Sequence, residues 1–314
     1  MLKDELMDFA IAMPKRFNKY EKSIYIEQIL KRFESYGYKG KLCTFGKSKN
    51  NAKNILIGDL SQAKVILMSN YDTPSKTLLK DLKYYPFSVA ENIKEEKRNL
   101  KKQVLIEIII SFLALLLLSF ASGLSGFNKN LIIFFVVVLL LFFVYVLRSH
   151  ANPANITRNS ASIALMLDIA SNKHKSVAFV LLDKNSQTNQ GFEEFKSYLN
   201  STIYSKTLKV ISLDCIAYGE TVVIGFNGDS KCIADDLKSL YPQMNCYCKS
   251  FSKEKCKSIG LDSFGRQVKI SVGTIQNHTF YVENTRTKKD VHVNVKQMEC
   301  ISQMINDYIR KEML

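Results

Sequence analysis

Polar residues that could bind a ligand or take part in catalysis follow three of the apolar runs that we expect to be strands. In an α/β sheet covered by helices, ligands and catalytic groups lie beyond the carboxyl ends of the strands. Among these residues, Asp72 and Asp214 carry carboxylates, which are donors that zinc accepts. Cys215 could act as a nucleophile, but with no histidine nearby in the sequence a buried structural cysteine is favoured. The three polar sets are 69–72, 183–186 and 214–215.

The cysteines and the basic charge indicate no further site. The seven cysteines are odd in number and have no disulfide-framework spacing, so we expect reduced thiols and a reducing compartment. Cys246, Cys248 and Cys256 lie close in sequence but do not have the usual spacing of zinc ligands. The formal charge of +15 comes from lysines scattered along the chain. This indicates a solvated surface, with attraction to anionic lipid favoured over nucleic acid.

Two long apolar runs, 104–124 and 131–147, interrupt an otherwise globular sequence. A membrane-spanning helix needs about 20 apolar residues. Both runs are apolar on every face rather than along one stripe, which argues against core helices of a soluble domain. The connector, 122–130, is short and rich in Gly, Ser and Asn. The sequence therefore predicts two transmembrane helices in an antiparallel hairpin.

Basic residues flank this hairpin on both outer sides. The segment 84–103, expected to be a juxtamembrane linker, contains five of them, and Arg148 follows the second span. The connector has only Lys129. Because basic flanks stay in the cytoplasm, we expect an integral protein of the cell membrane with both termini and the soluble domain cytoplasmic. The N-terminus lacks the apolar core of a secretory signal peptide.

The remaining residues, 1–83 and 151–314, are expected to form one α/β domain split by the hairpin. Amphipathic runs with helical spacing alternate in them with apolar, β-rich runs. The β-rich runs are apolar on both faces, as in a sheet covered on two sides by helices. The expected strands are 54–60, 63–69, 176–182, 208–213, 221–226 and 268–272.

The order of these segments resembles that of the zinc aminopeptidases related to bacterial leucyl aminopeptidases, glutamate carboxypeptidase and the transferrin receptor. Six blocks resemble, in order, an Arg-containing turn with its helix, a strand pair ending in His-x-Asp, an Asp-Asn-x-Ser-Gly helix start, a strand ending in Glu-Glu, a strand bearing a ligand Asp, and a His-Thr-x-x-Asp segment. The resemblance implies a three-layer zinc-exopeptidase-like domain with a mixed central β-sheet, interrupted by the hairpin. The blocks are 13–42, 54–73, 155–170, 176–186, 208–219 and 284–294.

The same resemblance implies that the zinc site is degenerate. Of the family's ligand positions only Asp214 is kept, together with Asp72, which in the family lies behind the metal and orients a ligand. At the other positions stand Asn70 for the first histidine ligand, Arg158 for the bridging aspartate, Asn185 for the catalytic-base glutamate, Ser186 for the glutamate ligand beside it, and Asn284 for the last histidine.

These replacements would remove both the metal and the base. Zinc prefers imidazole, thiolate or carboxylate donors, usually at least three from the protein, whereas Asn and Ser offer weak neutral oxygens. An amide at position 185 cannot accept a proton near neutral pH. Arg158 would bring a fixed positive charge to the place of the dication, and we expect it to form a salt bridge with Asp214. No cofactor is therefore expected.

The histidines offer one way to rebuild a metal site. His278 is followed by a threonine, like the family's last histidine ligand, but it lies six residues before Asn284. Even with His278, one histidine and Asp214 make a poor zinc site. The other histidines are expected at the surface, His150 and His174, or in an exposed strand, His292.

Two functions from different classes remain open. The first is a catalytically inactive, membrane-anchored pseudo-peptidase that binds a peptide or protein partner. The second is an active membrane-associated metallo-aminopeptidase with non-standard ligands, which would need zinc. A third, accessory role, in which the hairpin packs against another membrane protein, has no helix-pairing motif to support it. Nucleic acid is not expected as a partner.

Overall fold

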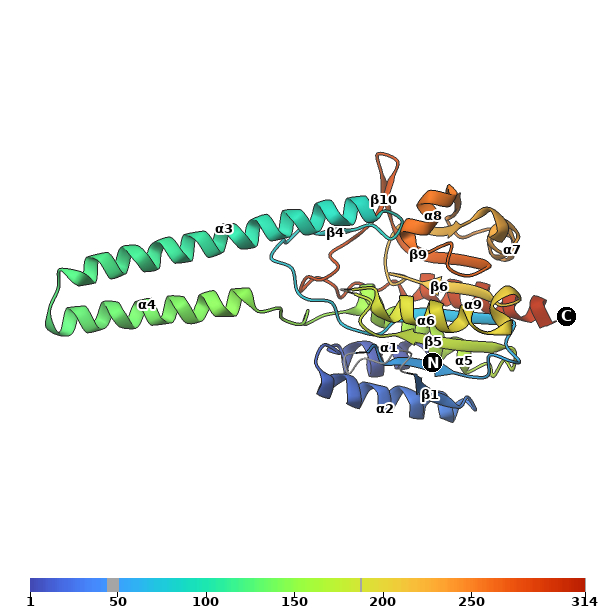
Figure 1. The fold of residues 1–314 in the computed structure, drawn as a ribbon. Coiled ribbons are helices and arrows are strands. Elements are labelled where there is room, and N and C mark those ends of the chain that lie inside the picture. Colours follow the sequence, from blue (N-terminus) through green and yellow to red (C-terminus); the bar gives the residue numbers. More distant parts are fainter. Residues whose placement is uncertain (44–50, 187, 314) are drawn as a thin grey trace.

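A mixed β-sheet with helices on both faces forms the body of the protein, and a long helical hairpin projects from it (Figure 1). The computed structural model describes residues 1–43, 51–186 and 188–313. Across these ranges the sheet has ten strands in the order β1-β2-β5-β3-β6-β9-β10-β4, with β7 beside β9 and β8 beside β7. The strands are β1 (Gly40–Cys43), β2 (Asn54–Ile57), β3 (Val65–Asn70), β4 (Lys83–Tyr84), β5 (Val177–Leu182), β6 (Lys209–Leu213), β7 (Thr221–Phe226), β8 (Cys246–Ser250), β9 (Arg266–Gln276) and β10 (Thr279–Glu283).

The centre of the sheet is parallel and its flanks are antiparallel. Strands β5, β3, β6 and β9 run in one direction, while β2, β7 and β10 pair antiparallel to their neighbours in this set. All six predicted strands are present, as β2, β3, β5, β6, β7 and β9. Their residues are almost entirely buried, which explains why continuous apolar runs identified them.

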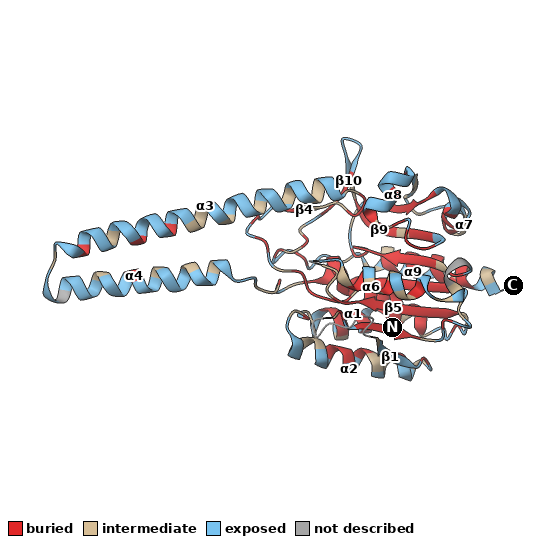
Figure 2. Ribbon diagram, in the orientation of Figure 1, coloured by how far each residue is buried: buried red, intermediate tan, exposed pale blue. Residues whose placement is uncertain are grey.

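The helices form a layer on each face of the sheet, so the predicted three-layer α/β arrangement is confirmed. One face packs with α1, α2, α5, α7 and α9 around the larger core, and the other packs with α6 around a smaller core. The buried strands lie between these layers in Figure 2. The helices of the body are α1 (Leu2–Leu6), α2 (Lys19–Ser35), α5 (Ala161–Ala170), α6 (Gln190–Asn200), α7 (Lys231–Leu240), α8 (Lys253–Ile259) and α9 (Val295–Met313), with short helical turns η1 (Met7–Ile11), η2 (Ile156–Ser160), η3 (Ile203–Lys206) and η4 (Gly228–Ser230).

Local sequence signals fix the helices nearest the site. Asn18 and Glu21 form a reciprocal capping box at the start of α2, and Gly37 follows its end with a φ of 90°. Helix α5 is the central helix of its layer, because every one of its residues except Asp168 is buried. It continues directly from η2, so the position of η2 is set by a helix that cannot move without disrupting the core.

The hairpin consists of α3 (Val89–Ser122) and α4 (Gly126–Leu147), which lie side by side and protrude from the body (Figure 1). Each is long and apolar enough to span a membrane, with mean hydropathies of 2.7 and 3.1 over their most apolar parts. Helix α3 begins at Val89, well inside the predicted linker 84–103. Ser88 accepts a hydrogen bond from the Glu91 amide at this end, and the Glu- and Lys-rich sequence that follows favours helix.

The base of α3 is fastened to the body. Phe87 stacks against Phe251 and Phe280, with ring centroids 5.4 and 5.6 Å apart, in a third apolar cluster. A side chain at Gly225 would clash with the Phe87 ring, so only glycine leaves room for it. The Asn92 side chain bonds both the amide and the carbonyl of Tyr85, at 2.9 and 2.8 Å. The junction between body and hairpin is therefore ordered by specific contacts.

Candidate functional site

The three polar sets meet at one edge of the sheet. Strands β5, β3 and β6 are adjacent and parallel, and Asn70 pairs in register with Leu182 at their carboxyl ends. A cavity of about 370 Å³ opens there. Its polar lining comes from the strand ends, from β9, from α6 and α8, and from the segment that leads into α3. The residues used below are Asn70, Tyr84, Arg158, Asn185, Glu193, Ser212, Asp214, Lys257, Gln267 and Lys269.

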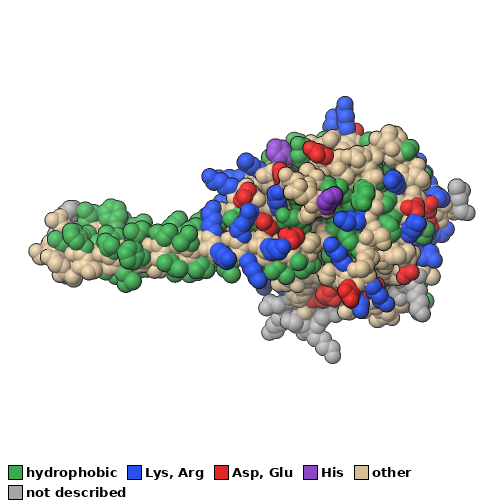
Figure 3. Space-filling model, turned by 90° about the horizontal axis from the view of Figure 1, so that it is seen from above, with side chains coloured by type: hydrophobic (Ala, Val, Ile, Leu, Met, Phe, Trp, Pro, Cys, Tyr) green, Lys and Arg blue, Asp and Glu red, His purple; other side chains and the backbone are tan. Residues whose placement is uncertain are grey.

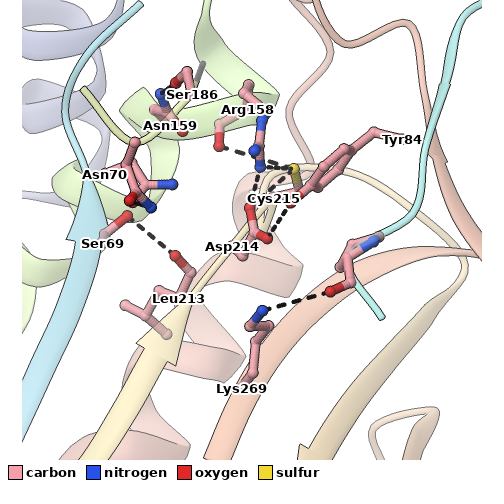
Figure 4. Close-up of polar contacts among 12 residues, drawn as sticks. Ser69, Asn70, Tyr84, Arg158, Asn159, Ser186, Leu213, Asp214, Cys215 and Lys269 are labelled. Carbon is pink, nitrogen blue, oxygen red and sulfur yellow. Dashed lines mark hydrogen bonds and ion pairs between the residues drawn. The ribbon is translucent and has the colours of Figure 1, made fainter. Parts of the chain in front are cut away.

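At the centre of the site, Arg158 and Asp214 form a buried ion pair (Figure 4). The Arg158 side chain comes from η2 and Asp214 from the residue after β6. Tyr84, at the end of β4, donates its hydroxyl hydrogen to the second carboxylate oxygen of Asp214 at 2.8 Å. The Tyr84 ring also lies 3.7 Å from the guanidinium carbon of Arg158. The predicted salt bridge is thus confirmed, and it has an aromatic partner that the sequence did not indicate.

The surroundings keep Arg158 charged and keep Tyr84 and Cys215 neutral. Burial alone would lower the pKa of Arg158, but Asp214 and Tyr84 raise it well above its ordinary value. Burial, opposed by Arg158 and helped by Asp214, holds the pKa of the Tyr84 hydroxyl well above its usual range. Burial and Asp214 likewise raise the pKa of the Cys215 thiol well above its ordinary value. A protonated, fully buried thiol is a poor nucleophile, so the structural role expected for Cys215 is favoured.

Beside the ion pair lies a second set of polar residues, Asn70, Asp72, Asn185 and Ser186, which are joined by hydrogen bonds. The Asn185 amide donates to the side-chain oxygen of Asn70 at 2.7 Å, so these two predicted ligand and base positions bond each other. The Ser186 amide donates to the carboxylate of Asp72 at 3.0 Å, and its hydroxyl donates to the Asp72 carbonyl at 3.2 Å. Burial raises the pKa of Asp72. By accepting both hydrogen bonds from Ser186, Asp72 holds the loop after β5 in place.

Asn284, the last of the predicted ligand positions, lies outside the cavity lining. It has a φ of 60°, and its carbonyl accepts hydrogen bonds from the amide and hydroxyl of Thr287 at 3.3 and 2.7 Å. Left-handed backbone with local bonding is typical of a turn, in which asparagine is tolerated. The structure thus brings together Asn70, Arg158, Asn185 and Asp214, but not Asn284.

The histidines do not gather at the site. His278 lies exposed in the turn between β9 and β10, with a φ of 61°. His174, expected at the surface, is in fact buried in the turn after α5, where its ring bonds the side-chain oxygen of Asn306, inside α9, at 2.9 Å. His292 is exposed as expected, but it lies in irregular chain rather than in a strand. None of these rings lines the cavity.

Two cations of the cavity, Lys257 and Lys269, were not predicted, and Lys269 is the one with buried contacts. The Lys269 ammonium, on β9, donates to the carbonyls of Ile259 at 3.0 Å and Pro86 at 3.5 Å. Burial lowers the pKa of Lys269. Through its two hydrogen bonds, Lys269 joins the end of α8 to the segment before α3. The only signal in the sequence was a lysine inside the apolar strand run 268–272, where a charged side chain is unusual.

Comparisons with known proteins agree on the fold. No protein-family model matches the sequence, and no curated protein matches it. Solved structures do match along nearly the whole chain. A glutaminyl cyclase from Bacteroides thetaiotaomicron has a TM-score of 0.54 at 12% identity, and covers 98% of this chain and 94% of its own. A Zn-dependent exopeptidase from Parabacteroides distasonis has a TM-score of 0.55 at 10% identity over the same shares.

A leucine aminopeptidase precursor from Bacteroides thetaiotaomicron also matches, with a TM-score of 0.51 at 11% identity, covering 98% of this chain and 93% of its own. The chain has the zinc-exopeptidase-like fold. The mixed sheet and its helical layers belong to this shared architecture. At such low identity the likeness concerns the fold, and the chemistry must be argued from the residues.

The donor set in this zinc-exopeptidase-like fold does not fit zinc. Both carboxylate oxygens of Asp214 are engaged, one by Arg158 and one by Tyr84. The neighbouring positions offer the amides of Asn70 and Asn185, which bond each other. Over the described part of the chain, no three side chains of His, Cys, Asp or Glu lie close enough to share a metal ion. A dication here would also meet the fixed charge of Arg158.

Proposed function

We propose that this protein is a membrane-anchored, non-hydrolytic binding module with the zinc-exopeptidase-like fold, which holds a peptide or protein segment in its cavity. One observation carries the proposal: the guanidinium of Arg158, with the Tyr84 hydroxyl, occupies the only carboxylate that the resemblance keeps as a metal ligand. A buried carboxylate that stays ionised is costly unless a cation compensates its charge, and for Asp214 a side chain supplies that cation.

The base chemistry supports the same conclusion. Asn185 stands where the resemblance places the catalytic glutamate. Its side-chain nitrogen donates a hydrogen bond to Asn70, and its side-chain oxygen accepts one from the Phe192 backbone amide at 3.2 Å. An amide does not take up a proton near neutral pH, so it cannot activate water. Restoring hydrolysis would require changes at several positions at once, because the metal ligands and the base are separate groups.

The hairpin supports membrane anchoring. The most apolar parts of α3 and α4 are only 17% and 6% buried, so these helices do not form a core of the body. Figure 3 shows their apolar side chains covering the projecting rod, with Lys and Arg gathered where the rod joins the body. Apolar surface of this extent is stable in lipid but not in water, and a basic collar suits an anionic lipid surface.

Zinc content and peptidase activity test the proposal on the full chain in lipid nanodiscs. After incubation with zinc and removal of the excess, we expect less than stoichiometric metal by elemental analysis and no cleavage of aminopeptidase substrates. An active zinc exopeptidase prepared in the same way serves as the control. One equivalent of bound zinc together with peptide cleavage that a chelator abolishes would overturn the proposal and support the active alternative.

A further inference from the structure

The cavity has an uncompensated positive charge. Three cations line it, Arg158, Lys257 and Lys269, against two carboxylates, Asp214 and Glu193. The carboxylate of Asp214 is used by Arg158, and no carboxylate in the described ranges lies within ion-pair distance of Lys269 or Lys257. A net positive, partly enclosed cavity attracts an anionic group.

Lys269 is the cation best placed to receive that group. Its ammonium bonds two backbone carbonyls, of Ile259 and Pro86, which fixes its position and leaves one of its three hydrogens for another acceptor. Carbonyl partners are neutral, so they hold the charge without cancelling it. Because Lys269 also lines the cavity, an anionic ligand can reach it without displacing an ion pair.

A buried acceptor lies on the same strand two residues away. Gln267 is 1% exposed and lines the cavity, yet its side-chain oxygen has no hydrogen-bond partner. Its amide nitrogen bonds the hydroxyl of Ser212 at 3.4 Å, which orients the oxygen away from that contact. An unpaired buried acceptor is costly unless a donor reaches it. A ligand N–H would satisfy it.

We propose that the cavity binds a peptide-like ligand through a free carboxylate, with Lys269 pairing the carboxylate and Gln267 accepting a ligand N–H. This deepens the proposed function and rests on it. The cavity volume of about 370 Å³ lies near the lower end of small-ligand pockets, roughly 300–1,000 Å³. It therefore suits the end of a chain or an acidic side chain with its backbone rather than a long peptide.

The lining favours this class over the two nearest alternatives. A ligand amine would need a free carboxylate, and Asp214 is already paired while Glu193 lies at 3.8 Å from Lys196. A phosphate dianion is usually held by several cationic or backbone N–H donors. Of the three cations in the lining, Arg158 is paired with Asp214 and Lys257 is exposed on α8, which leaves Lys269 as the unpaired cation inside the cavity. A carboxylate carries one charge and matches one ammonium.

Calorimetry on the full chain in nanodiscs tests the assignment with matched probes: N-acetyl-alanyl-alanine, its C-terminal amide, alanyl-alanine amide with a free amine, and inorganic phosphate. We expect the free acid to bind at least about tenfold more tightly than either amide, as removal of a charge-assisted hydrogen bond implies, and more tightly than phosphate. Equal binding of acid and amide, preference for the amine or for phosphate, or no binding of the acid at millimolar concentration would overturn it.

Lys269→Met separates recognition from structure. We expect the variant to lose about tenfold in affinity for the free acid and to bind the amide unchanged, because only the charge pair is removed. Lys231→Met, on the exposed face of α7, is the matched control. A variant that weakens acid and amide equally would reduce Lys269 to a packing role. If the variant does not fold, the ratio of the affinities of the natural chain for the free acid and for its amide still tests the proposal. The zinc measurement is independent of either result.

Discussion

Arg158 supplies the positive charge that balances the buried carboxylate of Asp214. By the resemblance it stands where an aspartate would bridge zinc, and in the structure it lies against Asp214, with both side chains about nine-tenths buried. The Tyr84 ring covers the guanidinium and its hydroxyl completes the carboxylate. A buried pair of this kind is costly to break, because removing one partner leaves the other charge without compensation.

Substitutions at this pair should therefore be strongly non-additive. We expect Arg158→Met to lower the free energy of unfolding by about 3–5 kcal/mol. The double variant Arg158→Met with Asp214→Leu should regain at least about half of that loss, because no charge remains buried, although the Tyr84 hydroxyl loses its acceptor. Denaturant unfolding of the body measures both. Arg98→Met, which breaks two surface ion pairs with Asp81 and Glu95, should cost no more than about 1 kcal/mol. A neutral Arg158→Met would contradict this account.

At the scale of elements, η2 is the turn that aims Arg158 into the cavity. Asp290 fastens its start: its carboxylate accepts a hydrogen bond from the Thr157 amide at 2.6 Å, and its carbonyl accepts one from the Ile156 amide at 3.2 Å. Asp290 is fully buried and its second carboxylate oxygen has no partner. The carboxylate is thus held in place by amides rather than by a cation.

This arrangement gives a defined pH dependence. Burial, opposed by the Thr157 amide, raises the pKa of Asp290 from 3.8 to about 6. Between these values the folded state holds more protons than the unfolded state, so this group makes stability fall as the pH rises from about 4 to 6. The total is about 2–3 kcal/mol at most. We expect Asp290→Asn to flatten the plot of unfolding free energy against pH over this range. The measurement is the difference in unfolding free energy between the variant and the natural chain at each pH. An unchanged difference across pH 4 to 6 would show that Asp290 does not titrate there.

The elements that could be predicted are those whose burial dictates their sequence. Strands β2, β3, β5, β6, β7 and β9 are apolar because both faces are covered. Four of the strands in the described ranges were missed. Strands β1 and β8 lie at sheet edges with mixed burial, β4 has only two residues, and β10 has only three buried residues between two exposed ones. The segment 84–103 was predicted as a basic juxtamembrane linker without a secondary-structure assignment, and α3 runs through most of it because of its N-terminal cap and its helix-favouring composition.

The candidate site was predictable only where resemblance supplied a position. Asn70, Arg158, Asn185 and Asp214 came together because they follow parallel strands or start the central helix. Tyr84 could not be placed, because it reaches Asp214 from a segment 130 residues earlier in the chain, through β4 and its pairing with β10. Periodicity carries no information on such contacts. Lys269 was hidden for a related reason: its carbonyl partners are backbone groups, which leave no mark on the sequence.

At the scale of the whole molecule, one continuous element connects the cavity to the projecting hairpin. The segment that supplies Tyr84 to the site leads directly into α3, and Val89 and Asn92 in its first turn also line the cavity. From there α3 continues without a break to the far end of the hairpin (Figure 1). The wall of the binding site is thus the root of the proposed membrane anchor, and the two must keep a fixed relative position.

The orientation of that anchor follows from its charges and can be tested with the chain's own thiols. Basic residues cluster at the root of the hairpin, whereas its tip has only Lys129, so we expect the body to face the cytoplasm and the tip to face outward. Cys232 is exposed on the body, and the segment 89–148 contains no cysteine. An impermeant maleimide applied to intact cells should label Lys129→Cys but not the natural chain, and permeabilisation should make Cys232 reactive in both. Labelling of the natural chain in intact cells, with no additional label on the Lys129→Cys variant, would reverse the topology. Because the root of α3 forms part of the cavity, that result would also move the proposed carboxylate site to the opposite side of the membrane.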